Sequence, residues 1–425
     1  MRSLRCSWAF LALTLACNTD TGRIGPETQS SEKLQEKSPQ VDAADQKAFN
    51  RANTDFSFAL YQQLRATESN LFYSPHSVST ALSMAYAGAA GSTADQMAAA
   101  MHFELADDKL NKAFNWLDQK LAQRNRLPPG EPGKGFVLRV ANALWSQTEF
   151  PFEVPFLDTL AVNYGTGMHL LDFTTNPEAS RLIINAWVEK RTEGKIKNLI
   201  PPRAITPLTR LVLTNAIYFL APWEHPFKKK STTKGPFHLS DGTTVDVQMM
   251  KQTQQLAYAE AAEWQAVEMP YNGRQLSMVL FLPKEGELET FESHFNGKTF
   301  RAALDQLHST RVELKMPRFE LEASVNLKKA LQAMGMVEAF TRGAADFTKM
   351  TALDDLYISA VLHKGYVKVD EEGTEAAAAT AVLAVRTSML LPPKIMTLNR
   401  AFLFVILDKP TGAVLFVGRV VDPTA

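Results

Sequence analysis

The sequence has almost no cysteine. Its two cysteines, Cys6 and Cys17, both lie within the first 17 residues of a 425-residue chain. A disulfide requires a pair of cysteines, and a thiolate-based metal site requires several. The sequence therefore excludes disulfides and cysteine-ligated metals from all of the chain that follows residue 17.

The chain also has no excess of charge of either sign. Lys and Arg together number 45, Asp and Glu also number 45, and the formal net charge is zero. This balance removes the electrostatic argument for nucleic acid or an anionic surface as the main partner. Because 45% of the residues are hydrophobic, the chain can still bury a large core. We expect a monomer that binds no nucleic acid.

Motifs for cofactors and catalysis are missing as well. There is no glycine-rich phosphate loop, no HExxH metal motif and no GxSxG nucleophile motif. The eight histidines stand singly along the chain, so no metal site is indicated. We expect no cofactor and no metal. A hydrolase remains an alternative, because a catalytic triad is assembled in space and not in sequence.

The N-terminus carries a targeting signal. Arg2 and Arg5 precede residues 8–16, which are apolar except for Thr14 and are too few to span a bilayer. We interpret residues 1–16 as a signal peptide. The residues that end it, LTLAC, resemble the lipobox of bacterial lipoproteins, which implies that Cys17 is lipidated and anchors the protein at the cell envelope or surface. The alternative is ordinary secretion with cleavage near Ala16.

The rest of the chain divides into a linker and one body. Residues 18–45 are polar, contain prolines and glycines and show no apolar periodicity, so we expect a flexible tether there. Residues 46–425 show helical periodicity first, followed from residue 212 by about eleven short extended runs. Helices followed by strands favour an α+β fold with antiparallel or mixed sheets.

One segment is unusual, residues 367–388, VKVDEEGTEAAAATAVLAVRTS. Its alanine run is compatible with a helix, because alanine is the best helix former. As a strand from Gly373, alternate positions from Thr374 to Val382 are all small or β-branched and suit a core, whereas the opposite positions tolerate water. Because none of the core-facing side chains is large, such a strand could insert into a sheet without the cost of desolvating a large side chain.

The residues of the body resemble the serpin family of serine protease inhibitors from about residue 46 to the end. The resemblance is carried by seven segments, which are NLFYSPHSVSTALSMAYAGAAGST (70–93), VANALW (140–145), INAWVEKRTEGKIKNLI (184–200), LTNAIYFLAPWEHPF (213–227), MPRFELEASVNLKKALQAMGM (316–336), ISAVLHKGYVKVDEEGTEAAAAT (358–380) and FLFVILDKPTGAVLFVGRVVDP (402–423). It implies a serpin fold with three β-sheets, eight to nine helices and an exposed reactive loop.

The resemblance also implies a function, which is suicide-substrate inhibition and not catalysis. A serine protease attacks the loop, and the cleaved loop inserts into the central sheet before the acyl-enzyme is hydrolysed. A non-inhibitory serpin that acts as a binding protein is the alternative. By loop spacing the scissile bond is Thr387-Ser388, which suits elastase-like or subtilisin-like proteases. Arg386-Thr387 is the alternative for a trypsin-like protease.

The resemblance assigns further residues. The hinge of the loop is Glu371, Glu372, Gly373, Thr374, Glu375, Ala376, Ala377, Ala378, Ala379 and Thr380. The resemblance assigns Trp223, Arg318 and Glu371 to the region where the loop meets the sheet, and it makes Arg318 the partner of Glu371. A polar cluster beneath the opening of the sheet comprises Ser74, Ser77, Asn215 and His363. The alternatives are an exposed ion pair of little consequence for Arg318 and Glu371, and ordinary core packing for Trp223 and His363.

Overall fold

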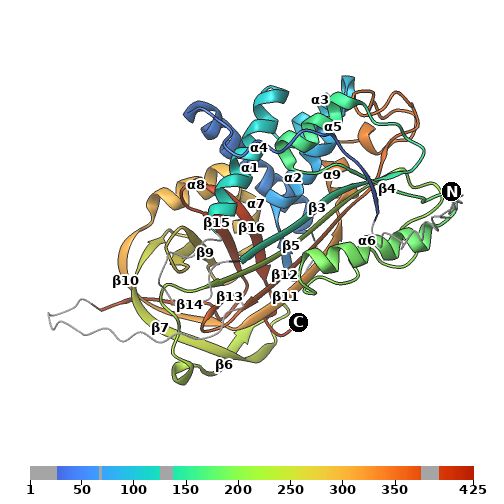
Figure 1. The fold of residues 1–425 in the computed structure, drawn as a ribbon. Coiled ribbons are helices and arrows are strands. Elements are labelled where there is room, and N and C mark those ends of the chain that lie inside the picture. The colour runs from blue at the N-terminus through green and yellow to red at the C-terminus, as the bar shows by residue number, and fades with distance from the viewer. Residues whose placement is uncertain (1–25, 67–68, 125–136, 375–391) are drawn as a thin grey trace, which may run out of the picture.

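The computed structural model describes residues 26–66, 69–124, 137–374 and 392–425 (Figure 1). Its α-helices are α1 (Ala43–Leu64), α2 (Pro75–Tyr86), α3 (Gly91–Ala100), α4 (Asp107–Arg124), α5 (Val154–Thr159), α6 (Pro177–Arg191), α7 (Leu288–His294), α8 (Gly297–Gln306) and α9 (Lys328–Ala333). A π-helical turn (Leu160–Tyr164) follows α5 directly, and short 3₁₀ turns occur at Lys229–Ser231 and Glu338–Phe340.

The first eight strands are β1 (Glu27–Gln29), β2 (Leu71–Tyr73), β3 (Val137–Gln147), β4 (Met168–Leu171), β5 (Leu211–Pro222), β6 (Thr233–His238), β7 (Thr244–Glu260) and β8 (Trp264–Pro270). The remaining strands are β9 (Leu276–Pro283), β10 (His308–Pro317), β11 (Phe319–Asn326), β12 (Ile358–Val369), β13 (Gly373–Thr374), β14 (Lys394–Thr397), β15 (Phe402–Asp408) and β16 (Ala413–Val420).

The strands form two hydrogen-bonded sheets. The central sheet has the order β1-β4-β3-β5-β13-β12-β11, and the second has the order β14-β10-β7-β8-β9-β15-β16-β2, with β6 paired to β7. The α+β serpin fold predicted from the sequence is confirmed. Two of the three expected sheets are continuous, because the long strand β7 pairs with β6, β10 and β8.

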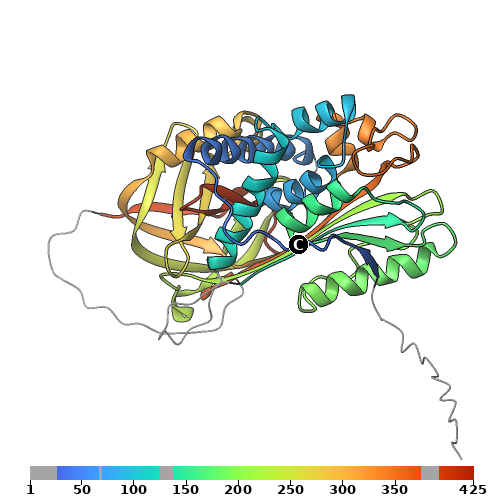
Figure 2. The same ribbon diagram turned by 45° about the horizontal axis from the view of Figure 1, so that its top comes forward.

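The central sheet separates two layers of core (Figure 2). Most of the helices lie on one side of it, and α6 lies alone across the other. Beneath α6, apolar side chains of the helix such as Ile184 and Val188 pack on Trp145, Val212 and Ala216 of the sheet. The sheet is therefore buried on both faces over its middle, and anything that enters it must displace well-packed neighbours.

Strands β5 and β12 are the neighbours at the middle of the sheet. They run parallel, and their pairing extends from Leu211 opposite Ile358 to Tyr218 opposite Tyr366. Beyond that point β13 lies between them and is antiparallel to both. We call the boundary between β5 and β12 the seam. A strand that continued from β13 along the seam would run in the same direction as β13 and could pair with both β5 and β12.

The N-terminal segment differs from the prediction. We call residues 26–42 the N-terminal strap, because they lie against the body and do not form a free tether. Strand β1 extends the central sheet by pairing with β4, with Thr28 opposite His169. Farther along, the backbone N–H of Glu36 donates to the carbonyl of Val162 at 3.0 Å, and Asn115 donates to the carbonyl of Glu36 at 2.9 Å.

The tether prediction is therefore wrong for the strap. It relied on apolar periodicity, whereas the strap is held mainly by backbone hydrogen bonds, which leave no pattern of side chains in the sequence. Side-chain contacts add to them, since Lys33 pairs with Asp158 at 2.8 Å.

We predict that the Glu36 amide exchanges its hydrogen slowly. An Asn115→Ala variant should speed that exchange several-fold, because it removes the donor to the Glu36 carbonyl and loosens the strap. Asn163→Ala is the matched control, since Asn163 bonds only to Thr159 within its own helix. Hydrogen exchange read by mass spectrometry checks this, and equally fast exchange in all three proteins would contradict a docked strap.

Candidate functional site at the opening of the central sheet

The start of the loop is already part of the central sheet. In β13, Gly373 pairs with Pro222 of β5, and Thr374 pairs with Ala221 of β5 and with Val369 of β12. The Thr374 side chain is fully buried, and its hydroxyl lies 2.8 Å from the Tyr271 hydroxyl. Thr374 thus faces the core, the direction that the strand interpretation gives it.

Glycine is required at position 373. Its φ is +154°, and a Cβ there would lie 2.2 Å from the carbonyl oxygen of Ala221. No other residue can make that close approach without moving β5. Gly373 is therefore the point at which the chain turns into the seam between β5 and β12.

The residues before Gly373 are fixed to the connection that follows β5. The N–H of Phe227 donates to the Glu371 carbonyl at 2.8 Å, and the N–H of Trp223 donates to the Glu372 carbonyl at 2.9 Å. The indole N–H of Trp223 donates to the Asp370 carbonyl at 3.0 Å. Trp223 also stacks on Tyr271, with ring centroids 4.5 Å apart. Its role is therefore more specific than core packing, because it binds the hinge backbone directly.

Two ion pairs hold the same turn, and we call them the hinge latch. Arg318, in the turn between β10 and β11, donates from Nε to both oxygens of Glu371 at 2.9 and 3.0 Å. The Thr232 hydroxyl also donates to Glu371. Beside this pair, Lys229 contacts Glu372 at 2.6 Å. Sequence reasoning missed Thr232 and Lys229, because neither lies near the hinge in sequence.

The latch is asymmetric in its burial. The Glu371 side chain is 2% exposed, whereas that of Arg318 is 43% exposed. Burial acts to raise the pKa of Glu371, but the hydrogen bonds from Arg318 and Thr232 outweigh it and hold that pKa below its usual value. The carboxylate thus depends on its partners, and the pair is not an exposed pair of little consequence.

The polar cluster beneath the seam comes together as the family pattern implies. Ser74 caps α2, and its backbone N–H donates to Nε2 of His363 at 3.2 Å. His363 bonds through Nδ1 to Asn215, and Asn215 donates to the Ser77 hydroxyl. Asn142 of β3, absent from the sequence assignment, joins the cluster, accepting from Ser77 at 2.8 Å and from Asn215 at 2.6 Å.

This cluster links α2 to three adjacent strands. Asn142, Asn215 and His363 are register neighbours on β3, β5 and β12. The bond between Asn215 and His363 crosses the seam, so it must break when β5 and β12 separate. Because Nε2 accepts a backbone N–H, His363 is held neutral, and burial lowers its pKa to about 3. His363 therefore acts by hydrogen bonding and not as an acid or base.

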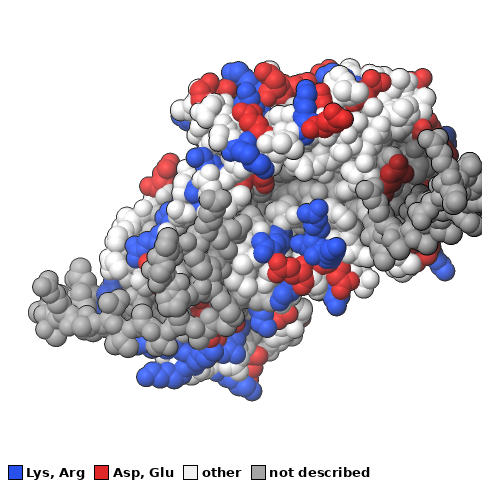
Figure 3. All heavy atoms as spheres, in the orientation of Figure 1, with Lys and Arg blue, Asp and Glu red and all other residues white. Residues whose placement is uncertain are grey.

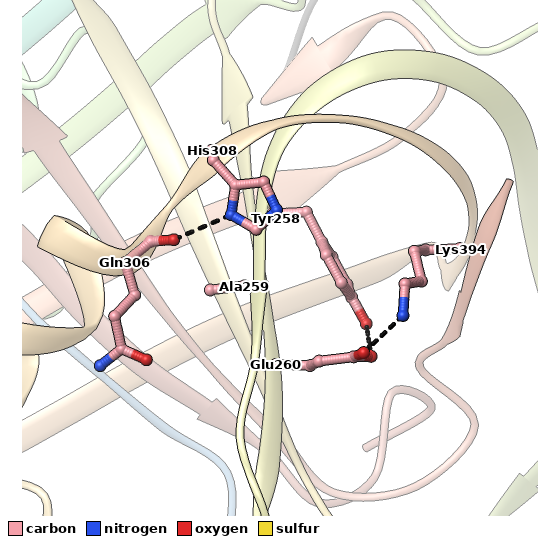
Figure 4. A pocket seen from close by; sticks show the side chains of 6 residues that line it. All are labelled: Tyr258, Ala259, Glu260, Gln306, His308 and Lys394. Atoms are coloured by element: carbon pink, nitrogen blue, oxygen red, sulfur yellow. Dashed lines mark hydrogen bonds and ion pairs between the residues drawn. The ribbon is translucent and has the colours of Figure 1, made fainter.

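The polar side chains of the pocket beside β14 are bonded mainly to one another (Figure 4). It has a volume of about 320 Å³ and is lined by Tyr258, Ala259, Glu260, Gln306, His308 and Lys394. Lys394 contacts Glu260 at 2.5 Å, and the Tyr258 hydroxyl donates to the same carboxylate at 2.7 Å. The residues that line it include no serine, threonine or cysteine to act as a nucleophile. Its contacts instead fasten β14, where the chain returns from the loop.

Several predicted residues lie outside the described part of the chain. These are Cys17, the hinge residues Glu375, Ala376, Ala377, Ala378, Ala379 and Thr380, and the candidate cleavage residues Arg386, Thr387 and Ser388. Among the residues that the structure describes, no cluster of three or more His, Cys, Asp or Glu side chains is arranged to hold a metal ion. No helix in the same ranges is long and apolar enough to cross a membrane.

Comparison with known proteins settles the family. The profile of the serpin (serine protease inhibitor) family matches residues 51–423. The chain belongs to the serpin family. It is 35% identical to the leukocyte elastase inhibitor of Equus caballus, over 88% of this chain and 98% of that protein.

Solved structures agree with this assignment. The native state of tengpin, a thermophilic serpin, superposes with a TM-score of 0.83 at 28% identity and covers 94% of this chain and 100% of tengpin. Human thyroxine-binding globulin with its hormone superposes with a TM-score of 0.79 at 30% identity and covers 90% and 100% of the two chains. Proteins named as an inhibitor and as a carrier are thus both similar to this serpin.

We predict that Arg318→Ala destabilises the protein more than Glu371→Gln does. Removing Arg318 leaves a buried carboxylate with one remaining side-chain donor, which should cost about 3 kcal/mol, whereas Arg318 without its partner can be solvated. Urea unfolding measures both changes. Lys368→Ala is the control, because Lys368 and Glu320 form an exposed pair that should be worth less than about 1 kcal/mol.

The defect of Arg318→Ala should also depend on pH. The depressed pKa of Glu371 gives stability that is present above its unfolded value near 4.5 and is lost as the pH falls through the folded value. In the variant only burial and Thr232 remain, so the pKa rises and ionisation becomes costly. The loss of stability should be larger at pH 7 than at pH 4, and an equal loss at both values would contradict the charge argument.

We predict that His363 contributes to loss of stability in acid. Its folded pKa of about 3 lies below its unfolded value of 6.5, so the unfolded state binds the extra proton and stability falls as the pH drops between these values. His363→Asn should lessen the slope of unfolding free energy against pH by about 1.4 kcal/mol per unit in that range. An unaltered slope in His363→Asn would contradict the assignment.

Proposed function

We propose that this serpin is a suicide-substrate inhibitor of serine proteases. The observation that carries the proposal is β13, since the loop has begun to form the strand that full insertion would complete. The leukocyte elastase inhibitor, a relative along nearly its whole length, supports the same function.

The covalent step belongs to the protease. Its serine hydroxyl adds to the carbonyl of Thr387, the Thr387-Ser388 bond breaks, and the proton from serine passes to the departing amine of Ser388. An ester now joins the protease to Thr387. Because the loop is cut, its upstream part can leave the surface and continue β13 along the seam. The attached protease is carried with it before water reaches the ester.

Insertion is favourable by hydrogen bonding alone. The 13 residues 375–387 at roughly 3.3 Å each would move the protease about 43 Å from Thr374. Net backbone hydrogen bonds of roughly 0.5 to 1.5 kcal/mol each would supply on the order of 10 kcal/mol, which is comparable with the stability of a whole domain. That energy is sufficient to distort the active site of the trapped enzyme.

The residue before the scissile bond determines which class of protease could attack the loop. Threonine at position 387 suits the small or open pockets of elastase-like and subtilisin-like enzymes, and Arg386 suits a trypsin-like enzyme one bond earlier. We further propose that residues 1–16 direct secretion and that a lipid on Cys17 anchors the protein at a bacterial cell envelope or surface. Without the lipid, the protein would be extracellular.

The middle of the face that Figure 3 shows does not suit nucleic acid. Lys and Arg side chains gather near its middle, with acidic side chains directly among them. On the central sheet, Arg139 pairs with Glu193, and Lys364 pairs with Glu322. An interleaved surface of this kind does not present the uninterrupted positive charge that a phosphate backbone requires.

The second candidate function is that of a binding protein. The similarity to thyroxine-binding globulin keeps it open. The two functions differ in one measurable product, because only an inhibitor forms an adduct that survives denaturation. A hydrolase would instead turn over a small ester or peptide, with no consumption of the protein.

We predict that Ala376→Glu abolishes inhibition and that Ala377→Glu does not. Counting from buried Thr374, which pairs with Ala221, position 376 faces the core of the inserted strand, and position 377 faces the other side of the sheet, opposite Tyr218 and near the cation of Lys195. A carboxylate at 376 would stop insertion, so the protease would hydrolyse the ester and cut the variant as a substrate. The fraction of adduct should fall at least tenfold, and only in Ala376→Glu.

The experiment mixes each protein with trypsin, an elastase and a subtilisin, followed by denaturing gels and mass spectrometry. An adduct with a released C-terminal peptide of 38 residues would locate the cut at Thr387-Ser388, and 39 residues would locate it at Arg386-Thr387. Cleavage of the unaltered protein by all three enzymes without an adduct would contradict inhibition and favour the binding protein.

A further inference from the structure

Helix α6 exposes an apolar face. Ala179, Leu182, Ile183 and Ala186 are all exposed and recur at helical spacing, so they form one stripe along the outer side of the helix. Leu182 is 52% exposed and Ile183 is 39% exposed. The inner side of α6 is already packed on the central sheet. The helix is therefore apolar on both sides, although nothing in the described body covers the outer one.

Cationic side chains lie at and after the C-terminal end of α6 in the chain, where Arg191 lies over Trp187, Lys195 lies over Tyr218 of the central sheet and Lys197 pairs with Glu189. Within residues 189–197 four cations stand against two acids, and they are Lys190, Arg191, Lys195 and Lys197 with Glu189 and Glu193. The four cations are exposed. An apolar helical face flanked by cations is the arrangement by which a helix lies on an anionic lipid surface. The whole chain is neutral, so this excess is local.

The N-terminal strap brings the start of the described chain to the same part of the molecule. Thr28 of β1 bonds to Nδ1 of His169 at 2.8 Å, and the His169 ring lies 5.5 Å from the Trp187 ring of α6. Only the side chain of His169 therefore lies between Thr28 of β1 and Trp187 of α6. Figure 2 shows β1 beside α6 at one end of the central sheet.

Because the strap is docked, little chain separates Cys17 from this edge. Pro26 is nine residues after Cys17, and nine residues reach at most about 32 Å even when fully extended. A free tether through residue 45 would allow roughly three times that reach and would leave every face equivalent. With the strap in place, the edge formed by β1, β4 and α6 must stay near the position of residue 17.

We propose that the outer face of α6, centred on Leu182 and Ile183, rests on the lipid surface to which Cys17 is anchored. The inference rests on the lipidation of Cys17 proposed above. It gives the body one orientation, in which β14 lies at the far end of the molecule from β1 (Figures 1 and 2). The chain after the C-terminal end of α6 lies nearer to β13, because Lys195 is over the Tyr218 ring of β5. A protease that arrives from solution can then reach the β14 end of the molecule.

The test uses the full mature chain, lipidated in a bacterial host and reconstituted into phosphatidylcholine vesicles with and without phosphatidylglycerol. Cys6 leaves with the signal peptide and Cys17 carries the lipid, so Leu182→Cys introduces a single free thiol for an environment-sensitive fluorophore. Ile395→Cys is the matched control, because Ile395 is 62% exposed on β14 at the opposite end. Both positions are exposed, so neither change should disturb folding.

We expect a blue-shifted fluorophore at position 182 that is shielded from iodide at least fivefold more than at position 395. Phosphatidylglycerol should increase the difference. Equal iodide access at both positions would overturn the inference, as would shielding at 395 alone. Shielding at 182 only after a second protein is added would assign the stripe to a protein partner and would also overturn it, as would a mature chain whose mass lacks the lipid.

Failure of this inference is distinguishable from failure of the proposed function. The same vesicles are mixed with a soluble elastase and examined for the adduct. An adduct with a solvent-exposed fluorophore at 182 would leave inhibition intact and reject the orientation. A shielded fluorophore without an adduct would support the orientation and reject inhibition.

Discussion

The parallel pairing of β5 and β12 is the constraint around which this molecule is organised. Antiparallel strands usually dominate a sheet of this kind, and parallel pairs are slightly less stable per residue. Here the two parallel middle strands pair directly with each other because β13 separates them only at Gly373 and Thr374. Inserting an antiparallel strand exchanges one parallel ladder for two antiparallel ones, so each added residue gains partners on both sides.

The polar groups around the seam control when that exchange occurs. The bond between His363 and Asn215 crosses it, and the hinge latch closes its upper end. Buried polar groups are costly to leave without partners, so partial opening of the seam is penalised before any new ladder can compensate. The result is a barrier and not a stable preference, which is the condition for a fold that stores free energy. Neutral His363 and ionised Glu371 both favour the closed state near pH 7.

The sequence predicted those features of the site that local patterns determine. Alternation along the alanine run places Thr374 toward the core, and Ser74 before Pro75 predicts the start of α2, where the structure has it. It could not predict contacts that join distant segments without a motif, such as Lys229 with Glu372 or Asn142 with Asn215. A surface lysine and a strand asparagine have many possible partners, and only the register of the strands selects one.

The tether prediction failed for the strap for a related reason, because a short strand of polar residues resembles a linker in sequence. Strand β1 has no apolar side to bury, and its position is fixed by the free edge of β4. The continuity of the second sheet through β7 was equally hidden, because run lengths give strands but not their pairing. In each case the sequence did not reveal which strand would serve as the pairing partner, and for β1 it did not predict the strand either.

The fastening of β14 gives a geometric reason why the proposed mechanism requires the loop to be cut before it inserts. Full insertion of residues 375–387 would place residue 387 roughly 43 Å along the seam from Thr374. From there to Lys394 the chain spans at most about 25 Å. Yet β14 lies at the loop end of the molecule, held by its ladder to β10 and by the contact of Lys394 with Glu260. An intact loop could therefore insert fully only by pulling β14 off its sheet, whereas a cut loop inserts without moving it. In the proposed mechanism, cleavage removes this geometric restraint, and the protease supplies the one step that the fold cannot perform alone.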